Sequence, residues 1–147
     1  MKHHPSVGVP LVVAGPGVRN GLAVTVPATT LDLAATFLEL AGVSIQADMD
    51  SKSMLPLLKG GVEKHRDVVY SGLKNWRAVF DGRYKLTRGF SDVPTEIKLY
   101  DLEADPLENN DISEANPKIV ERLSKLHAFV VDGVRTVEWP AAAFDYA

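Results

Sequence analysis

The first apolar segment is short and lacks polar alternation. Residues 9–13 read Val-Pro-Leu-Val-Val and lie between Gly8 and a Gly-Pro-Gly turn at residues 15–17. A continuous apolar run of this length is typical of a strand buried on both faces, and such a strand needs neighbours on both sides. We therefore expect a buried strand at residues 9–13, with an edge strand of a small domain as the alternative. The rest of the sequence offers few neighbours for it.

A helical period follows at residues 30–41. Thr29 or Thr30 can cap this helix, Asp32 falls in its first turn, and Gly42 can close its C-terminus. Apolar residues occupy more than one face of the helix. We therefore expect it to be largely buried.

The period then changes to two, after a short helical turn that we expect to begin at Ser53 and to end at the glycine pair 60–61. Asp81-Gly82 lies between two alternating runs and predicts a hairpin over residues 76–88, with a two-residue turn whose central positions both have positive φ. The predicted strands are VVYSG, WRAVF, YKLTR and KLYDL.

The last predicted element is a helix that begins at Pro117, is capped by Asn116, and ends near Gly133. The pattern as a whole predicts an α+β fold. One buried strand and a helix come first. A small antiparallel sheet of three to four strands follows, with the C-terminal helix packed on it.

Composition narrows the classes of protein. The chain has 147 residues, 46% of them hydrophobic and 24% charged, with a formal net charge of -3, which favours a globular domain without nucleic acid or membrane as a partner. The absence of cysteine excludes disulfides, thiolate metal sites and a cysteine nucleophile. No export signal is recognisable, so we expect a cytoplasmic location if Met1 is the true start, and the compartment is otherwise open.

Several segments together resemble, in this order, the C-terminal part of sulfatases, which belong to the alkaline-phosphatase-like superfamily. The resemblance runs from about Lys2 to about Leu126. It implies that residues 1–62 are a remnant of the large α/β domain of these enzymes and that residues 63–147 form their small C-terminal subdomain. The segments are VPLVVAGPGV, TTLDLAATFLELAGV, SMLPLLKG, RYKLTRG and KLYDLEADPLENNDI.

The resemblance also implies a chemistry: sulfatases use a formylglycine made from Cys or Ser in a Cys/Ser-x-Pro-x-Arg motif, with a calcium ion held by Asp and Asn side chains. This chain has no Cys and no Ser two residues before a Pro, and Asp48 and Asp50 lack the further ligands of a calcium loop. We expect those two residues to lie in a solvated loop. We expect a fragment that is not catalytically competent alone and has no cofactor of its own, with calcium and formylglycine present only in a complete family member.

Lys2, His3 and His4 stand directly before the first apolar segment. By resemblance, Lys2 corresponds to the sulfate-contacting lysine of the family, and the two histidines are candidates for substrate binding. The spacing from Lys2 to Val9 is about three residues shorter than in the family. The alternative is a frayed, solvated N-terminus.

Other candidates are isolated. His65 is either a proton-transfer group or, as we expect, a surface loop residue, and His127 is expected to be a half-buried packing residue of the last helix. The basic residues around the predicted hairpin either help to hold an anionic substrate or, as we expect, form a solvated charged face. They are Arg77, Arg83, Lys85 and Arg88.

The sequence is therefore compatible with three alternative functions. The first is the C-terminal part of a sulfatase-like hydrolase, acting on a sulfated small molecule or glycan only in the complete enzyme. The second is the same part of a related phosphodiesterase or phosphonate hydrolase. The third is a stand-alone binding or assembly module that forms a homo-oligomer through an exposed strand at Val9–Val13.

Overall fold

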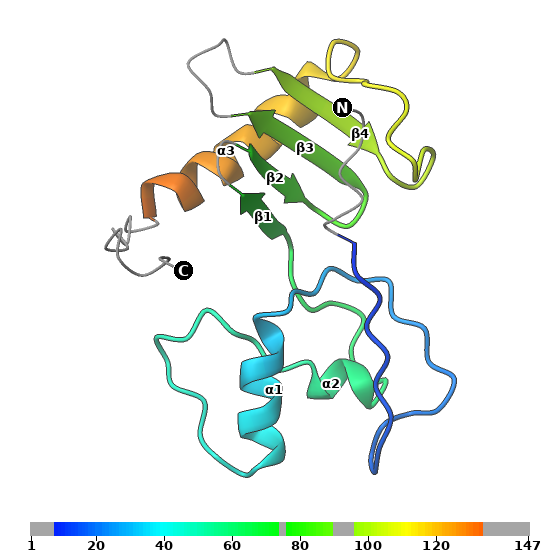
Figure 1. The fold of residues 1–147 in the computed structure, drawn as a ribbon, viewed down its shortest axis with the longest axis vertical. Coiled ribbons are helices and arrows are strands. Elements are labelled where there is room, and N and C mark those ends of the chain that lie inside the picture. The colour runs from blue at the N-terminus through cyan, green and yellow to red at the C-terminus, as the bar shows by residue number, and fades with distance from the viewer. Residues whose placement is uncertain (1–7, 74–75, 90–95, 134–147) are drawn as a thin grey trace, which may run out of the picture.

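A computed structural model describes residues 8–73, 76–89 and 96–133 and contains four strands and three helices (Figure 1). The sheet and the last helix lie together, and the first two helices lie beside them among long loops. The elements are α1 (Asp32–Leu40), α2 (Leu55–Leu58), β1 (Val69–Leu73), β2 (Trp76–Phe80), β3 (Tyr84–Gly89), β4 (Ile97–Asp101) and α3 (Pro117–Gly133).

The sheet is a meander. Its strand order is β1-β2-β3-β4 and every neighbouring pair is antiparallel. Val79 on β2 lies opposite Leu86 on β3, which lies opposite Leu99 on β4, so one face of the sheet is apolar along its centre. The predicted α+β class and the four predicted strands are confirmed.

The turn between β2 and β3 differs from the prediction by one residue. Its central residues are Gly82 and Arg83, and only Gly82 has a positive φ, of 100°. The Asp81 carboxylate accepts hydrogen bonds from the backbone N–H groups of Arg83 (3.0 Å) and Tyr84 (2.7 Å). Because its side chain binds the amides of the turn, Asp81 can precede the turn with an ordinary negative φ instead of occupying a central position with a positive φ.

Helix α3 covers the apolar face of the sheet, as predicted. Its Leu123 joins Val79, Leu86 and Leu99 in a cluster whose members are at most 2% exposed. Arg122, beside it on the helix, forms an ion pair of 2.6 Å with Asp81 of the hairpin turn. The side chain of His127 lies outside the part of the chain that the structure describes, so its packing stays a prediction.

Helix α1 begins two residues later than expected, and neither threonine caps it. Leu31 occupies the N-cap position without a side-chain hydrogen bond. Instead, the Asp32 carboxylate accepts a hydrogen bond from the backbone N–H of Thr29 at 3.1 Å. The predicted end is confirmed: Gly42 has a φ of 69°, and the following N–H bonds back to Leu38.

The prediction that α1 is largely buried is wrong for this chain. Leu31, Phe37 and Leu40 are 62%, 63% and 58% exposed, whereas Ala35 and Thr36 are buried. Within the described residues, only the side of the helix that carries Ala35 and Thr36 packs against other segments. The apolar side chains of Leu31, Phe37 and Leu40 are therefore exposed to solvent.

The expected strand at residues 9–13 is absent. Val9, Leu11 and Val12 are 63%, 54% and 91% exposed, and the segment has no regular secondary structure. A strand needs a hydrogen-bonded neighbour. Within the described residues, no backbone group of this segment is bonded to another backbone group.

Candidate functional site

The three N-terminal candidates, Lys2, His3 and His4, lie outside the described residues, which begin at Gly8. The role of Lys2 as a sulfate-contacting lysine therefore stays a prediction. The described part of the chain contributes three other features to consider: a buried ionic cluster at the start of α1, a buried lysine on the sheet, and an apolar groove.

His65 is not a surface loop residue. It is 4% exposed, and its Nε2 atom lies 3.0 Å from the Oδ2 atom of Asp32. The loop before β1 folds back onto the start of α1, which removes the imidazole from solvent. Because both side chains are buried, His65 has no access to a ligand, and the proton-transfer alternative does not fit either.

Asp32 is the centre of a cluster that we call the Asp32 clamp, consisting of Asp32, Lys52, His65 and Arg66. The Arg66 Nε atom donates to both carboxylate oxygens, at 2.9 and 3.1 Å, and a second guanidinium nitrogen donates to Oδ1. The backbone N–H of Lys52 donates to Oδ1 at 2.9 Å. Five donor groups, including His65 and the backbone of Thr29, thus converge on a carboxylate that is 0% exposed.

The electrostatics of the clamp favour an ionised Asp32. Burial alone raises the pKa of this carboxyl, but the hydrogen bonds from Arg66, from the backbone amides of Lys52 and Thr29, and from His65 outweigh it and hold the pKa well below its usual range. Every donor belongs to the protein. The clamp is therefore a structural anchor and not a binding site.

The clamp joins three stretches of chain. The Lys52 ammonium donates to the backbone carbonyl of His65, and the Arg66 guanidinium donates to that of Asp50 at 2.7 Å. The start of α1, the loop before α2 and the loop before β1 are thereby held together. The clamp thus fixes how the two helices sit beside the sheet.

The basic residues around the hairpin do not form one charged face. Arg83 is 52% exposed and pairs with Asp101 at 2.8 Å, as expected for a surface residue. Lys85 is buried, which contradicts the expected solvated face. Arg77 and Arg88 lie opposite each other at the other end of the strands from the hairpin turn.

Lys85 pairs with Glu108 on the face of the sheet opposite α3. The two side chains are 5% and 15% exposed, and Nζ lies 2.6 Å from Oε1. The ammonium also lies 5.9 Å from the centre of the Trp76 ring. Because its charge is already matched by a carboxylate, Lys85 is not available to hold an anionic substrate.

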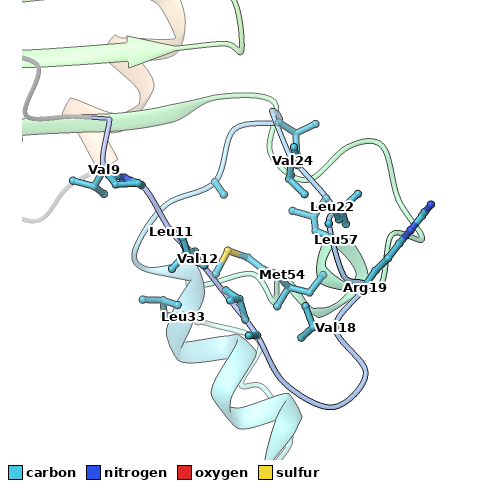
Figure 2. A pocket seen from close by; sticks show the side chains of 18 of the residues that line it. Val9, Leu11, Val12, Val18, Arg19, Leu22, Val24, Leu33, Met54 and Leu57 are labelled. Atoms are coloured by element: carbon cyan, nitrogen blue, oxygen red, sulfur yellow. The ribbon is translucent and has the colours of Figure 1, made fainter.

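An apolar groove runs between residues 9–24 and the two short helices (Figure 2). Its volume is about 870 Å³, and it is lined mainly by aliphatic side chains, among them Leu11, Leu33 and Met54. Arg19 is the one charged residue in the described lining. A groove without converging polar groups is suited to packing against another apolar surface, not to catalysis.

The described residues contain no group of three or more His, Asp or Glu side chains placed to hold a metal ion. Asp48 and Asp50 are exposed, in agreement with a solvated loop. The chain also lacks the Cys or Ser of the formylglycine motif. The described residues therefore do not fit a calcium site, the sequence does not supply a formylglycine, and no step of a reaction is assigned to these residues. No helix among the described residues is long and apolar enough to cross a membrane.

Comparison with known proteins gives the family. Residues 1–132 match the family model described as N-sulphoglucosamine sulphohydrolase, C-terminal. A choline-sulfatase from Rhizobium meliloti (strain 1021) is 35% identical over 150 residues, which cover 97% of this chain and 28% of that protein. Arylsulfatase K of Danio rerio is 28% identical over 136 residues, which cover 84% of this chain and 26% of that protein. This chain belongs to the sulfatase family and corresponds to its C-terminal part.

Solved structures agree in fold. BT1596, a 2-O GAG sulfatase, matches with a TM-score of 0.62 and 30% identity, over 81% of this chain and 28% of that chain. A phosphonate monoester hydrolase from Silicibacter pomeroyi matches with the same TM-score at 20% identity, which shows the fold alone. The chain spans little more than a quarter of the length of these relatives.

Proposed function

We propose that this chain is the C-terminal part of a sulfuric ester hydrolase and has no hydrolase activity by itself. The family match over residues 1–132 carries this proposal, together with the lack of a nucleophile motif in the sequence. The nucleophile and the calcium ligands belong to the portion of such enzymes that precedes the matched region. When bound, those groups supply attack on sulfur and neutralisation of the sulfate oxygens.

The chain's own contribution is structural, with one exception. Residues 1–62 belong with the large domain, and residues 63–147 form the small subdomain that borders it. The Asp32 clamp holds these two parts in a fixed relation. Lys2 is the exception: by its resemblance to the sulfate-contacting lysine of the family, it donates to the sulfate group and stabilises negative charge on it.

Two assays test this function. The pure chain should hydrolyse neither nitrophenyl sulfate nor choline sulfate, which the similarity to choline-sulfatase makes the first natural substrate to try. Turnover above a heat-treated control would overturn the proposal. In a longer protein that carries a Cys/Ser-x-Pro-x-Arg motif before this chain, Lys2→Ala should lower kcat about 100-fold. Lys59→Ala, at an exposed position, should leave it unchanged.

A phosphonate or phosphodiester hydrolase is the second candidate, because the same fold occurs in the Silicibacter pomeroyi enzyme. The longer protein distinguishes the two. A kcat/KM for a nitrophenyl phosphonate that exceeds the value for nitrophenyl sulfate would favour this second candidate.

A further inference from the structure

Arg88 is a half-buried arginine at the end of β3 that lies away from the hairpin turn (Figure 1). Its Nε atom is buried and donates no hydrogen bond. Within the described ranges, no residue accepts a hydrogen bond from its guanidinium group or forms an ion pair with it. A buried donor on a charged group is costly to leave unpaired, so an acceptor from outside these residues is expected here.

The neighbouring cations of the sheet differ from Arg88, because each of them has a carboxylate partner. The pairs are Arg83 with Asp101 at 2.8 Å, Lys85 with Glu108 at 2.6 Å, and Lys98 with Glu96 at 3.1 Å. Arg88 also points to the other face of the sheet from Lys85, since it shares the face of Leu86, two positions earlier. None of these three carboxylates is therefore available to balance its charge.

A second arginine adds positive charge beside Arg88. Arg77 on β2 is its cross-strand neighbour, and like charges at directly opposite positions repel each other. The Arg77 side chain is held from the far side: its Nη1 atom donates to the carbonyl of Trp76 at 2.8 Å. Its Cδ atom lies over Gly72 of β1, where an added Cβ would come within 2.5 Å of it. This fixed charge makes the surroundings of Arg88 favourable for an anion.

We propose that Arg88, with Arg77 beside it, binds an oxyanion, namely the sulfate or carboxylate group of a ligand. A planar guanidinium presents Nε and one Nη as parallel donors that match two oxygens of one such group. The bound oxyanion would satisfy the buried Nε–H and balance the charge of the two arginines. Lys85, whose charge Glu108 already matches, takes no part in this site.

A titration of the isolated chain tests the proposal. Sodium methyl sulfate and sodium acetate are added in separate experiments, with sodium chloride at the same ionic strength as the reference. NMR follows the Nε–H signal of Arg88 and the backbone amides of residues 87–89. We expect saturable shifts with a Kd of about 1 mM for the preferred anion, and none with chloride. The anion that binds more tightly identifies the group as a sulfate or a carboxylate.

Three variants locate the site. Arg88→Gln removes the charge and the paired donors and should weaken binding about tenfold or more at the amides of residues 87 and 89. Arg88→Lys keeps the charge without the paired donors, so it should restore only part of the affinity. Arg83→Gln is the matched control in the same hairpin. Because Arg83 already pairs with Asp101, its replacement should leave the Kd unchanged.

Two results would overturn the proposal. The absence of a saturable shift with either anion would mean that a carboxylate of the chain itself satisfies Arg88. An equal Kd for the wild type and Arg88→Gln would place the bound anion elsewhere. The titration measures binding without turnover, so either result would leave the proposed hydrolase function untouched.

Discussion

Asp32 and His65 are separated by 33 positions in the sequence, yet their Oδ2 and Nε2 atoms lie 3.0 Å apart in the structure. Both side chains are buried, at 0% and 3% exposed. This contact and the Arg66 guanidinium beside it attach the loop before the sheet to the first helix. The pair therefore connects α1 to the loop that leads into β1.

Asp32→Asn should destabilise the protein by about 3 kcal/mol. The substitution removes the charge that Arg66 and His65 face, and breaking a buried ion pair from one side leaves the other charge uncompensated. Urea unfolding followed by circular dichroism measures the change. Asp67→Asn is the control, because Asp67 pairs with Lys64 at the surface and both side chains are more than 70% exposed. An equal effect of the two substitutions would contradict the role of the clamp.

The contribution of Asp32 to stability should depend on pH in a defined direction. Its pKa in the folded protein is held below the ordinary value of 3.8, so the unfolded state binds the proton first as pH falls. The contribution is thus complete above about pH 5 and is lost as pH falls through the unfolded-state pKa toward the folded-state pKa.

The free energy of unfolding of the wild type and of Asp32→Asn should therefore converge between about pH 5 and pH 2. The difference between the two proteins reports Asp32 alone, because other carboxylates with a lowered pKa are present in both. Asp81 is one of them: burial raises its pKa, but hydrogen bonds from Arg122 and from backbone amides outweigh this and lower the pKa below its ordinary value. A difference that stays constant down to pH 2 would exclude this linkage.

Glu108→Gln should cost about 2 kcal/mol, because it leaves the buried ammonium of Lys85 without its counter-charge. Glu103→Gln provides the comparison. Glu103 is 73% exposed and lies 3.4 Å from Arg83, so its loss should have little effect on the urea midpoint. Equal midpoints for the two variants would show that the Lys85 pair is not buried in solution.

Gly82→Ala should destabilise the hairpin by about 1 kcal/mol. The backbone at Gly82 has a φ of 100°, a conformation that residues with a Cβ rarely adopt, so an alanine there is strained even though its Cβ would make only van der Waals contact with the Pro27 ring, at 3.4 Å. Gly61→Ala is the control, because an added Cβ there meets only the Pro56 carbonyl oxygen, at 3.6 Å. Thermal unfolding of both variants checks the difference.

Leu86→Ala should cost about 3 kcal/mol, since it opens a cavity in the cluster between the sheet and α3. Val12→Ala should change the stability of the isolated chain hardly at all, because Val12 is 91% exposed. Chemical denaturation of the two variants tests whether the stability of the chain resides in the sheet and α3. A large effect of Val12→Ala would indicate that its segment is already covered.

The sequence alone predicted those elements whose partners lie nearby in the chain. The hairpin at Asp81-Gly82 and the strands on both sides of it follow from a two-residue period and a turn signal, which are local properties. The helix at Pro117 follows in the same way from its first residues and its apolar spacing. Tertiary contacts were not needed to recognise any of them.

The structure of residues 9–13 and the burial of His65 could not be predicted from local sequence patterns. Residues 9–13 have the composition of a buried strand, but a strand exists only where another segment accepts its hydrogen bonds, and the described residues contain none. His65 has no apolar or periodic surroundings, and its partner Asp32 was interpreted only as a favourable first-turn residue. A contact between polar residues 33 positions apart leaves no signal in the local pattern.

The strand order of the sheet has a consequence for how the chain folds. Each strand pairs with the next one in sequence, so all the pairings between Val69 and Asp101 form by closing short loops. The Asp32 clamp requires a much longer loop to close before its contacts can form. We expect the sheet to assemble first, so that the ordering of α1 against it is the late step of folding.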